Sequence, residues 1–151
     1  MKLYESSTII SATPDVLWRV MSEHFQDENA QLFYIESMLP SLPSMANIKL
    51  VSKYGFRRCA IKGHVSLAEP PNKLVLSFTV SLPIFKTKEY WSISIESNND
   101  FSSVITFSSN VNGWLTLRHI RNVSTERQLQ IDNFIHTLKN KIEVVSNVQS
   151  D

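Results

Sequence analysis

The sequence predicts an α+β fold in which a curved, seven-stranded antiparallel sheet wraps around a long C-terminal helix, with two short helices between the first and second strands. Three observations predict it. The chain opens on an alternating segment, residues 3–11, that runs straight into a helical pattern. Strand-like segments then follow one another from residue 47 to residue 110. From residue 124 onward, apolar residues recur at spacings of four and three, as on one face of a helix.

The first strand and the first helix meet within TIISATPDVLWRVM, residues 8–21. The segment up to residue 11 is rich in Thr and Ile, which is typical of a strand. Thr13 suits the N-cap, Pro14 suits the first helical position, and Asp15 complements the helix dipole. A second short helix is predicted from about Asp27 to Met38, because the prolines of LPSLPS, residues 39–44, would end it.

Six further strands account for most of the remaining chain. NIKLVSKY is the first, and GFRRCAIKGHVSLAEPPN supplies two, with one turn near Lys62–Gly63 and another at residues 70–72. KLVLSFTVSL, EYWSISIES and FSSVITFSSN complete the series, with a hairpin turn at residues 97–100. NVNGW, residues 110–114, is predicted as the loop that leads into the terminal helix.

Strict alternation gives these strands one apolar face and one Ser/Thr face, which is typical of an antiparallel sheet covered on one side. The terminal helix supplies the cover, because its apolar residues form a single stripe. The first strand is expected to pair beside the last one. Residues 1–151 therefore form one domain. The inward rows are predicted to be Leu74, Leu76, Phe78, Val80 and Leu82, then Trp91, Ile93 and Ile95, then Ile105 and Phe107, with Ile131, Ile135, Leu138, Ile142 and Val145 on the helix.

Composition excludes several classes of function. Hydrophobic residues make up 42% of the 151 residues and charged residues 19%, and the formal charge is +1, so nothing indicates nucleic-acid binding or an anionic membrane surface. The single cysteine, Cys59, allows no intramolecular disulfide and no multi-cysteine zinc site. Three glycines are too few for dinucleotide or Walker loops, and no cofactor is predicted. With no signal peptide and no apolar run of about 18 residues, a cytoplasmic protein without a membrane span is expected.

Three stretches resemble the START/Bet v 1-like superfamily, also called SRPBCC or helix-grip, over nearly the whole chain. They are IISATPDVLW, GFRRCAIKGHVSLAEPPNKLVLSF and FIHTLKNKIE. Leu17 departs from the family pattern by separating Val16 from Trp18, which are more often adjacent. The closest resemblance is to the polyketide cyclase/dehydratase-like proteins of bacteria. The matching residues are Ile10, Ala12, Pro14, Val16 and Trp18, then Gly55, Arg58, Glu69 and Leu74, then Leu138, Lys139 and Glu143.

This resemblance implies a protein that binds a hydrophobic small molecule, such as a lipid or a polyketide, between the sheet and the C-terminal helix. Some members of the family catalyse ring closure, dehydration or hydrolysis, so an enzyme of the cyclase/dehydratase type is the first alternative. A co-chaperone-like interaction domain is the second. Its sign would be an exposed apolar patch, for which LPIFKTK, residues 82–88, is the one hint; a hairpin over the cavity mouth is preferred. Monomer and homodimer both stay open.

Inward parity and aromatic character select the residues expected to line a ligand cavity. The cautious alternative is that they form an ordinary core. Trp114, in the loop after Gly113, is expected to seal the cavity or to contact its contents. The predicted ligand-binding residues are Phe78, Trp91, Ile93, Phe107, Trp114, Ile131 and Ile135.

Three residues are candidates for proton transfer in the enzyme alternative: His119, Arg58 and Glu69. His119 lies near the expected cavity mouth, although a surface position on the first turns of the helix is the simpler interpretation. Parity turns either Arg57 or Arg58 inward, where a carboxylate such as Glu69 or Glu89 would have to pair with it, unless both arginines reach water.

The histidines show no metal-binding spacing. His24 is expected to favour the helix dipole as a cation, His64 to be exposed, and His136 to lie at the rim or in solvent. Cys59 is interpreted as a small buried hydrophobe, because no histidine is placed near it.

Overall fold

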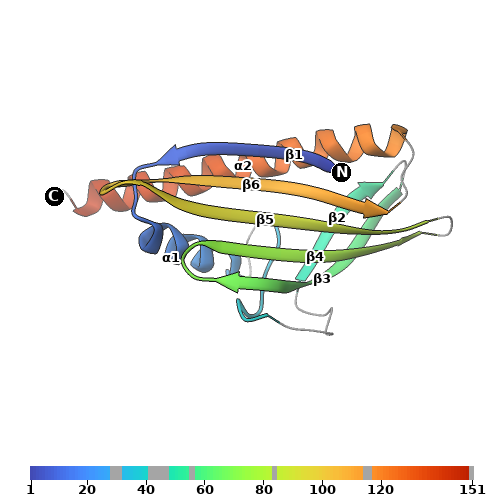
Figure 1. Ribbon diagram of the computed structural model, residues 1–151, viewed down its shortest axis with the longest axis horizontal. Coiled ribbons are helices and arrows are strands. Elements are labelled where there is room, and N and C mark those ends of the chain that lie inside the picture. The colour runs from blue at the N-terminus through green and yellow to red at the C-terminus, as the bar shows by residue number, and fades with distance from the viewer. Residues whose placement is uncertain (28–31, 41–47, 55–56, 83–84, 114–116, 150–151) are drawn as a thin grey trace.

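The computed structural model describes residues 1–27, 32–40, 48–54, 57–82, 85–113 and 117–149. Within these ranges the chain forms six strands and two helices (Figure 1). They are β1 (Lys2–Ile10), α1 (Pro14–Phe25), β2 (Ile48–Tyr54), β3 (Arg57–Glu69), β4 (Lys73–Leu82), β5 (Phe85–Asn99), β6 (Ser102–Gly113) and α2 (Leu117–Gln149).

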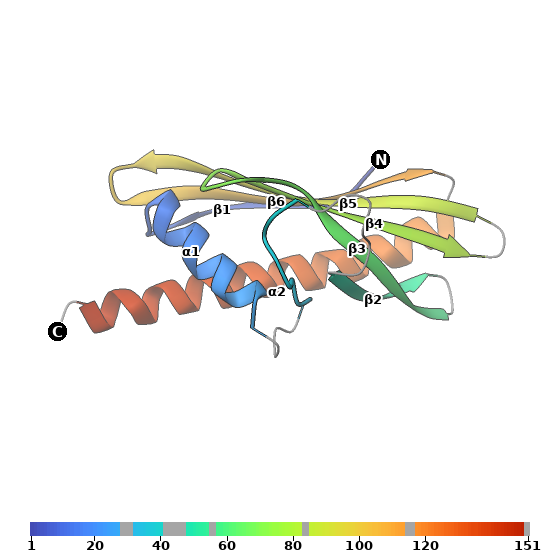
Figure 2. The ribbon, with the colours of Figure 1, turned by 90° about the horizontal axis from the view of Figure 1, so that it is seen from below.

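The strands form one antiparallel sheet in the order β1-β6-β5-β4-β3-β2, so the first strand pairs beside the last as predicted. Figure 2 shows two layers, with the sheet on one side and both helices on the other. The long α2 runs along the sheet, and α1 lies beside it. This α+β arrangement matches the predicted fold class. No helix in the described part of the chain has an apolar run long enough to cross a membrane.

The predicted turn at Lys62–Gly63 is wrong, and the described residues form six strands rather than seven. Residues 57–63 pair with β2 and residues 63–69 pair with β4, so β3 is one long strand that changes partner at Gly63. A side chain there would be impossible without rearrangement, because a Cβ would lie 2.4 Å from the ring of Phe78 and 2.6 Å from the carbonyl oxygen of Ser77. Gly63 is therefore a site of close approach within a strand, not a turn residue.

The second predicted helix is also wrong for its described part, because residues 32–40 contain no helical residue. This connector is extended: Phe33 and Ile35 are buried while Tyr34 and Glu36 are exposed. The amide of Ile35 donates to the carbonyl of Phe25 at 2.8 Å, which satisfies one free carbonyl at the end of α1. Buried and exposed side chains thus alternate along residues 33–36, where proline positions suggested a helix. This alternation places Phe33 in the core.

The loop predicted at residues 110–114 is wrong for its first four residues, since β6 continues to Gly113. Val111 is buried opposite Glu89, and Gly113 pairs with Thr87 at a backbone φ of 119°, a conformation that glycine tolerates. The predicted inward rows are confirmed wherever the side chains are described. The buried apolar residues on these rows include Leu74, Leu76, Phe78, Val80, Trp91, Ile93, Ile95, Ile105, Phe107, Ile131, Ile135, Leu138 and Ile142.

Candidate functional site

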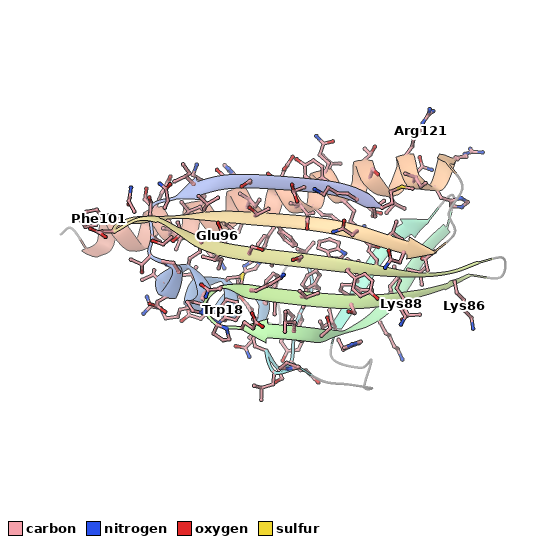
Figure 3. All side chains as sticks on the ribbon, viewed as in Figure 1. Trp18, Lys86, Lys88, Glu96, Phe101 and Arg121 are labelled. Atoms are coloured by element: carbon pink, nitrogen blue, oxygen red, sulfur yellow. The ribbon has the colours of Figure 1, made fainter. Side chains whose placement is uncertain are left out.

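A buried ion pair joins the sheet to α2. Glu89 lies on β5 in the inward row that also carries Thr87 and Trp91, while the alternate residues Lys86 and Lys88 project from the outer side (Figure 3). Arg127 lies on α2, one helical turn before Ile131, and therefore on the stripe that faces the sheet. Both charged side chains are 0% exposed, and the carboxylate receives the guanidinium through both of its oxygens.

Neighbouring side chains complete the hydrogen bonds of the carboxylate. Oε1 of Glu89 accepts from the indole Nε1 of Trp91 at 2.9 Å and from the hydroxyl of Ser109 at 2.7 Å. Nε of Arg127 also donates to Oε1, and its Nη2 donates to Oε2 at 2.9 Å. Removing two charges from water costs several kcal/mol for each ion, so a pair of this kind persists only with such additional partners.

The guanidinium has partners of its own on α2. Nη1 of Arg127 donates to Oε1 of Gln130 at 2.9 Å and lies 3.5 Å from a carboxylate oxygen of Glu126. Its central carbon lies 5.2 Å from the ring centroid of Trp91, which is within cation–π range. The side chain is therefore held from three directions, and the pair forms a fixed polar wall inside an apolar layer.

Thr87 adds a hydroxyl without a partner to this wall. Its side chain is 2% exposed, and Oγ1 has no hydrogen-bond partner among the residues that the structure describes. On the inner face its cross-strand neighbours are Val80 and Gly113. A Cβ on Gly113 would meet the methyl group of Thr87 at 3.0 Å, so the methyl covers the glycine and the hydroxyl points elsewhere. A buried hydroxyl without a partner costs about 1–3 kcal/mol, so it requires an explanation.

An aromatic cluster fills the interior next to the ion pair. Trp91 lies 5.5 Å from both Phe33 and Phe107 and 6.3 Å from Phe78, measured between ring centroids. On the α1 side, Phe25 stacks on Phe33 at 5.1 Å and on Phe134 at 5.0 Å. These rings come from six separate segments of the chain, and the connector between α1 and β2 supplies Phe33.

A pocket of ≈ 90 Å³ lies between the end of α1 and α2. His24 forms one wall: its ring is buried, packs on Phe25 and Phe134, and accepts a hydrogen bond at Nδ1 from Nζ of Lys141 at 2.9 Å. Burial, followed by the charge of Lys141, lowers the pKa of His24. The lining residues are His24, Leu32, Gln130, Asn133, Phe134 and Thr137.

The structure brings together most of the residues predicted to line a cavity. Phe78, Trp91 and Phe107 belong to the aromatic cluster, and all six whose side chains are described are buried. They pack largely against one another in this structure, so a role in binding remains a proposal. The six are Phe78, Trp91, Ile93, Phe107, Ile131 and Ile135, while Trp114 lies outside the described residues.

The three predicted catalytic candidates do not gather at one site. Glu69 is exposed at the end of β3, whereas His119 is half-buried in the first turn of α2. The end of β3 and the start of α2 lie far apart in Figure 1. The backbone of Arg58 pairs with Lys53 in the β2–β3 hairpin, and its side chain lies outside the described residues.

The positions of the three other histidines, His64, His24 and His136, agree only in part with the prediction. His64 was expected to be exposed, but it is buried on β3, where burial and then the charge of Lys88 lower its pKa. His24 does not serve as a free cation at the helix end, because its ring accepts from Lys141. His136 is exposed as predicted, with Nε2 3.2 Å from the amide nitrogen of Asn140.

Sequence reasoning missed Arg127 and misassigned the partner of Glu89, which was sought among the strand arginines. A signal for both was present. Glu89 has the same parity as Trp91, and Arg127 lies four residues before Ile131 on the apolar stripe. Opposite charges that interrupt two facing apolar rows indicate a buried ion pair.

No protein-family model and no curated protein matches the sequence. Solved structures do match. A START superfamily protein from Mycobacterium smegmatis aligns with a TM-score of 0.58 at 11% identity, over 94% of this chain and 97% of that chain. The Zhui aromatase/cyclase from Streptomyces sp. R1128 aligns at 0.63 and 9% identity, over 93% and 92%.

The Aha1 dimer from Colwellia psychrerythraea aligns with a TM-score of 0.53 at 10% identity, over 89% of this chain and 94% of that chain. Likeness at such low identity establishes the fold alone. The chain has the START-like helix-grip fold, and the resemblance inferred from the sequence is confirmed at that level.

Proposed function

We propose that this chain, with its START-like fold, binds an apolar small molecule that carries a hydrogen-bonding oxygen, between the sheet and α2. The single observation that carries the proposal is the buried, unpartnered hydroxyl of Thr87 beside the ion pair of Glu89 and Arg127. A core designed only for packing gains nothing from such a group. A ligand oxygen that bonds to this hydroxyl would remove its cost.

The surroundings of Thr87 fit an apolar guest. Val80 on β4 is buried opposite it, and Val111 on β6 is buried opposite Glu89. On α2, Val123 and Ile131 are buried one turn before and after Arg127. Trp91 and the rest of the aromatic cluster would bound the site on the α1 side. Lipids and polyketides combine an apolar body with hydroxyl or carbonyl oxygens, so both remain within the proposed class.

Binding is favoured over the enzyme alternative by the placement of polar groups. The end of β3, which carries Glu69, lies far from the start of α2, which carries His119 (Figure 1), and the carboxylate of Glu89 is engaged in a structural network. A general acid or base must reach its proton within hydrogen-bond distance, directly or through one water. The candidate acid and base groups are therefore not brought together in the described part of the chain. The hydroxyl of Thr87, in contrast, is buried where it could bond to a bound ligand.

Native mass spectrometry of gently purified protein tests the function itself. A co-purifying small molecule, or saturable uptake of an apolar fluorescent dye by the unliganded chain, is the expected result. The placement is tested by Thr87→Val, which keeps the shape and removes the hydroxyl. One lost hydrogen bond of about 0.5–1.5 kcal/mol should weaken the ligand roughly 2- to 12-fold without loss of stability.

Ser22→Ala is the matched control, because Ser22 carries another buried hydroxyl without a partner, on α1 rather than β5. It should leave affinity unchanged. Equal effects of the two substitutions would refute the placement at Thr87. Absence of both a co-purifying molecule and saturable dye uptake would refute the function.

A further inference from the structure

The pocket between α1 and α2 is a second place where a ligand could be held. At ≈ 90 Å³ it has room for only a few heavy atoms. Phe134 forms one wall and packs on Phe107 at 5.2 Å and on Phe25 at 5.0 Å, so it separates this pocket from the aromatic interior. Leu32 adds a second apolar wall, and the remaining lining residues are polar.

The contact with Lys141 fixes the proton on His24. An ammonium group has three donors and no acceptor, so Nδ1 of His24 must be the acceptor in the 2.9 Å contact. A neutral imidazole that accepts at Nδ1 carries its proton at Nε2. Both ring nitrogens of His24 are thereby defined: Nδ1 is occupied by Lys141, and the remaining polar atom is an N–H donor on a residue that lines the pocket.

The contact with Arg127 fixes the amide of Gln130 in the same way. A guanidinium cannot accept a hydrogen bond, so Gln130 must turn its oxygen to Nη1 of Arg127, at 2.9 Å. The amide nitrogen then faces away from Arg127 with two N–H groups, and no residue in the described ranges accepts from them. The buried ion pair thus orients a donor on a residue of the pocket wall.

The third polar wall comes from one turn of α2. The hydroxyl of Thr137 donates to the carbonyl of Asn133 at 2.9 Å, so its proton is used within the helix. The side-chain amide of Asn133 is exposed at the pocket rim, where it can turn its N–H groups toward a bound acceptor. The polar lining therefore offers donors from three residues.

We infer that this pocket binds the carboxylate group of a small organic acid. A carboxylate accepts hydrogen bonds at two oxygens and donates none. It therefore matches a lining in which the groups of fixed orientation, on His24 and Gln130, are N–H donors. The ammonium of Lys141, hydrogen-bonded to His24, adds a favourable field. The apolar walls Leu32 and Phe134 suit a short alkyl chain behind the carboxylate. A cation is disfavoured, because it would face these same donors.

The charges around His24 decide how such binding depends on pH. Lys141 lowers the pKa of the ring and Asp27 raises it, and Glu23 lines the neighbouring groove together with Lys141. A bound carboxylate would favour the imidazolium form and raise the pKa of His24. Binding should therefore strengthen as the pH falls toward the pKa of His24.

Sodium propionate is the probe, and NMR of backbone amides and histidine rings is the readout. The expected result is saturable shifts at His24, Gln130, Asn133 and Thr137, with millimolar affinity because few atoms bind. The pKa of His24 should rise with propionate. Sodium chloride at equal ionic strength and neutral propionamide are the ligand controls. Propionamide that moves the same signals with equal affinity would overturn the assignment to a carboxylate.

Gln130→Glu is the decisive variant, because it keeps an oxygen acceptor for Arg127 while replacing the donor by a negative charge. Propionate affinity should fall at least tenfold. Gln128→Glu makes the same change at an exposed position on α2 outside the pocket lining, and it should change affinity less than twofold. Equal losses in both variants, or no saturable shift in the parent, would overturn the proposal.

His24→Phe is a second variant that keeps the ring packing and removes the Nε2 donor. It should weaken propionate several-fold, and unchanged affinity would refute the role of His24. The pocket proposal does not depend on the interior ligand. Uptake of an apolar dye with no response to propionate would leave the proposed function intact and reject this site alone.

Discussion

Replacing Arg127 by Met tests whether the ion pair is a coupled unit of the fold. The substitution leaves the carboxylate of Glu89 in the core without its guanidinium, while Trp91 and Ser109 still donate to it at 2.9 and 2.7 Å. Breaking a fully buried pair from one side costs about 3–5 kcal/mol. For a chain of 151 residues, each kcal/mol lowers the melting temperature by about 2–4 °C, so a fall of roughly 10 °C is expected.

The double variant Glu89→Gln/Arg127→Met should recover most of this loss. The amide oxygen of Gln can still accept from Trp91 and Ser109, and the thioether of Met can pack on the indole ring. Replacing a buried pair by neutral groups of similar volume is often neutral, so the double variant should lie within about 2 kcal/mol of the parent. The coupling energy between the two positions should therefore exceed about 2 kcal/mol.

Urea unfolding followed by far-UV circular dichroism measures all four corners of this cycle. Arg121→Met is the matched control, because Arg121 is exposed on the same helix and projects away from the sheet (Figure 3). It should change stability by at most about 0.5 kcal/mol. A loss below about 1 kcal/mol for Arg127→Met, or additive effects of the two core substitutions, would refute the interpretation of a desolvated, coupled pair.

Three further predictions follow from the packing. The lowered pKa of His24 means that the unfolded chain binds more protons than the folded chain below about pH 6.5. The free energy of unfolding, measured in urea, should therefore decrease as the pH falls below this value. His24→Phe should make this free energy depend less on pH. Gly63→Ala forces a Cβ against the Phe78 ring at 2.4 Å, so it should destabilise by at least about 1–3 kcal/mol in urea unfolding, and adding Phe78→Leu should restore part of the loss. Phe33→Ala should cost about 3–5 kcal/mol yet increase uptake of an apolar dye, whereas Phe101→Ala, 81% exposed, should change neither quantity; unchanged uptake in Phe33→Ala would show that this ring does not occupy ligand space.

The elements that the sequence predicted well are those that local pattern determines. Alternation placed Trp91 and its row inward, and the spacing of Ile131 and Ile135 placed α2 with its apolar stripe on the sheet. These assignments do not require the identity of the residues packed against each element, because the spacing of apolar residues within one strand or helix already predicts its buried face. The order of elements came from the same patterns along the chain, and the solved structures support the START-like resemblance that this order carries.

The errors arose where a distant residue determines the local structure. Gly63 resembles a turn residue in isolation, and only the ring of Phe78 on β4 explains why a glycine is required inside a strand. Proline positions predict a helix for the connector that carries Phe33, because no local signal reports that the aromatic rings this residue meets come from α1, β4 and β5. Propensity cannot encode partners that the fold brings together from so far along the chain.

The candidate site was only partly predictable for the same reason. Parity placed Glu89 inward, but its partner Arg127 lies 38 residues away on another layer. The contact between His24 and Lys141 spans 117 residues and fixes a tautomer that no local signal reports. Periodicity predicts which aromatic residues face the interior. Which polar atoms donate and which accept inside a site depends on the partners that the fold places next to them.

The buried network also limits what an interior ligand can use. Oε1 of Glu89 already accepts from Trp91, Ser109 and Arg127, and Nη1 of Arg127 donates to Gln130. A ligand that competed for these groups would have to break charge-assisted bonds in a region of low dielectric, where each lost partner is costly. The hydroxyl of Thr87 carries no such cost, since it has no bond to lose. Recognition through Thr87 therefore predicts a neutral oxygen on the ligand, because a second carboxylate there would meet the negative charge of Glu89, two residues along the same inward row.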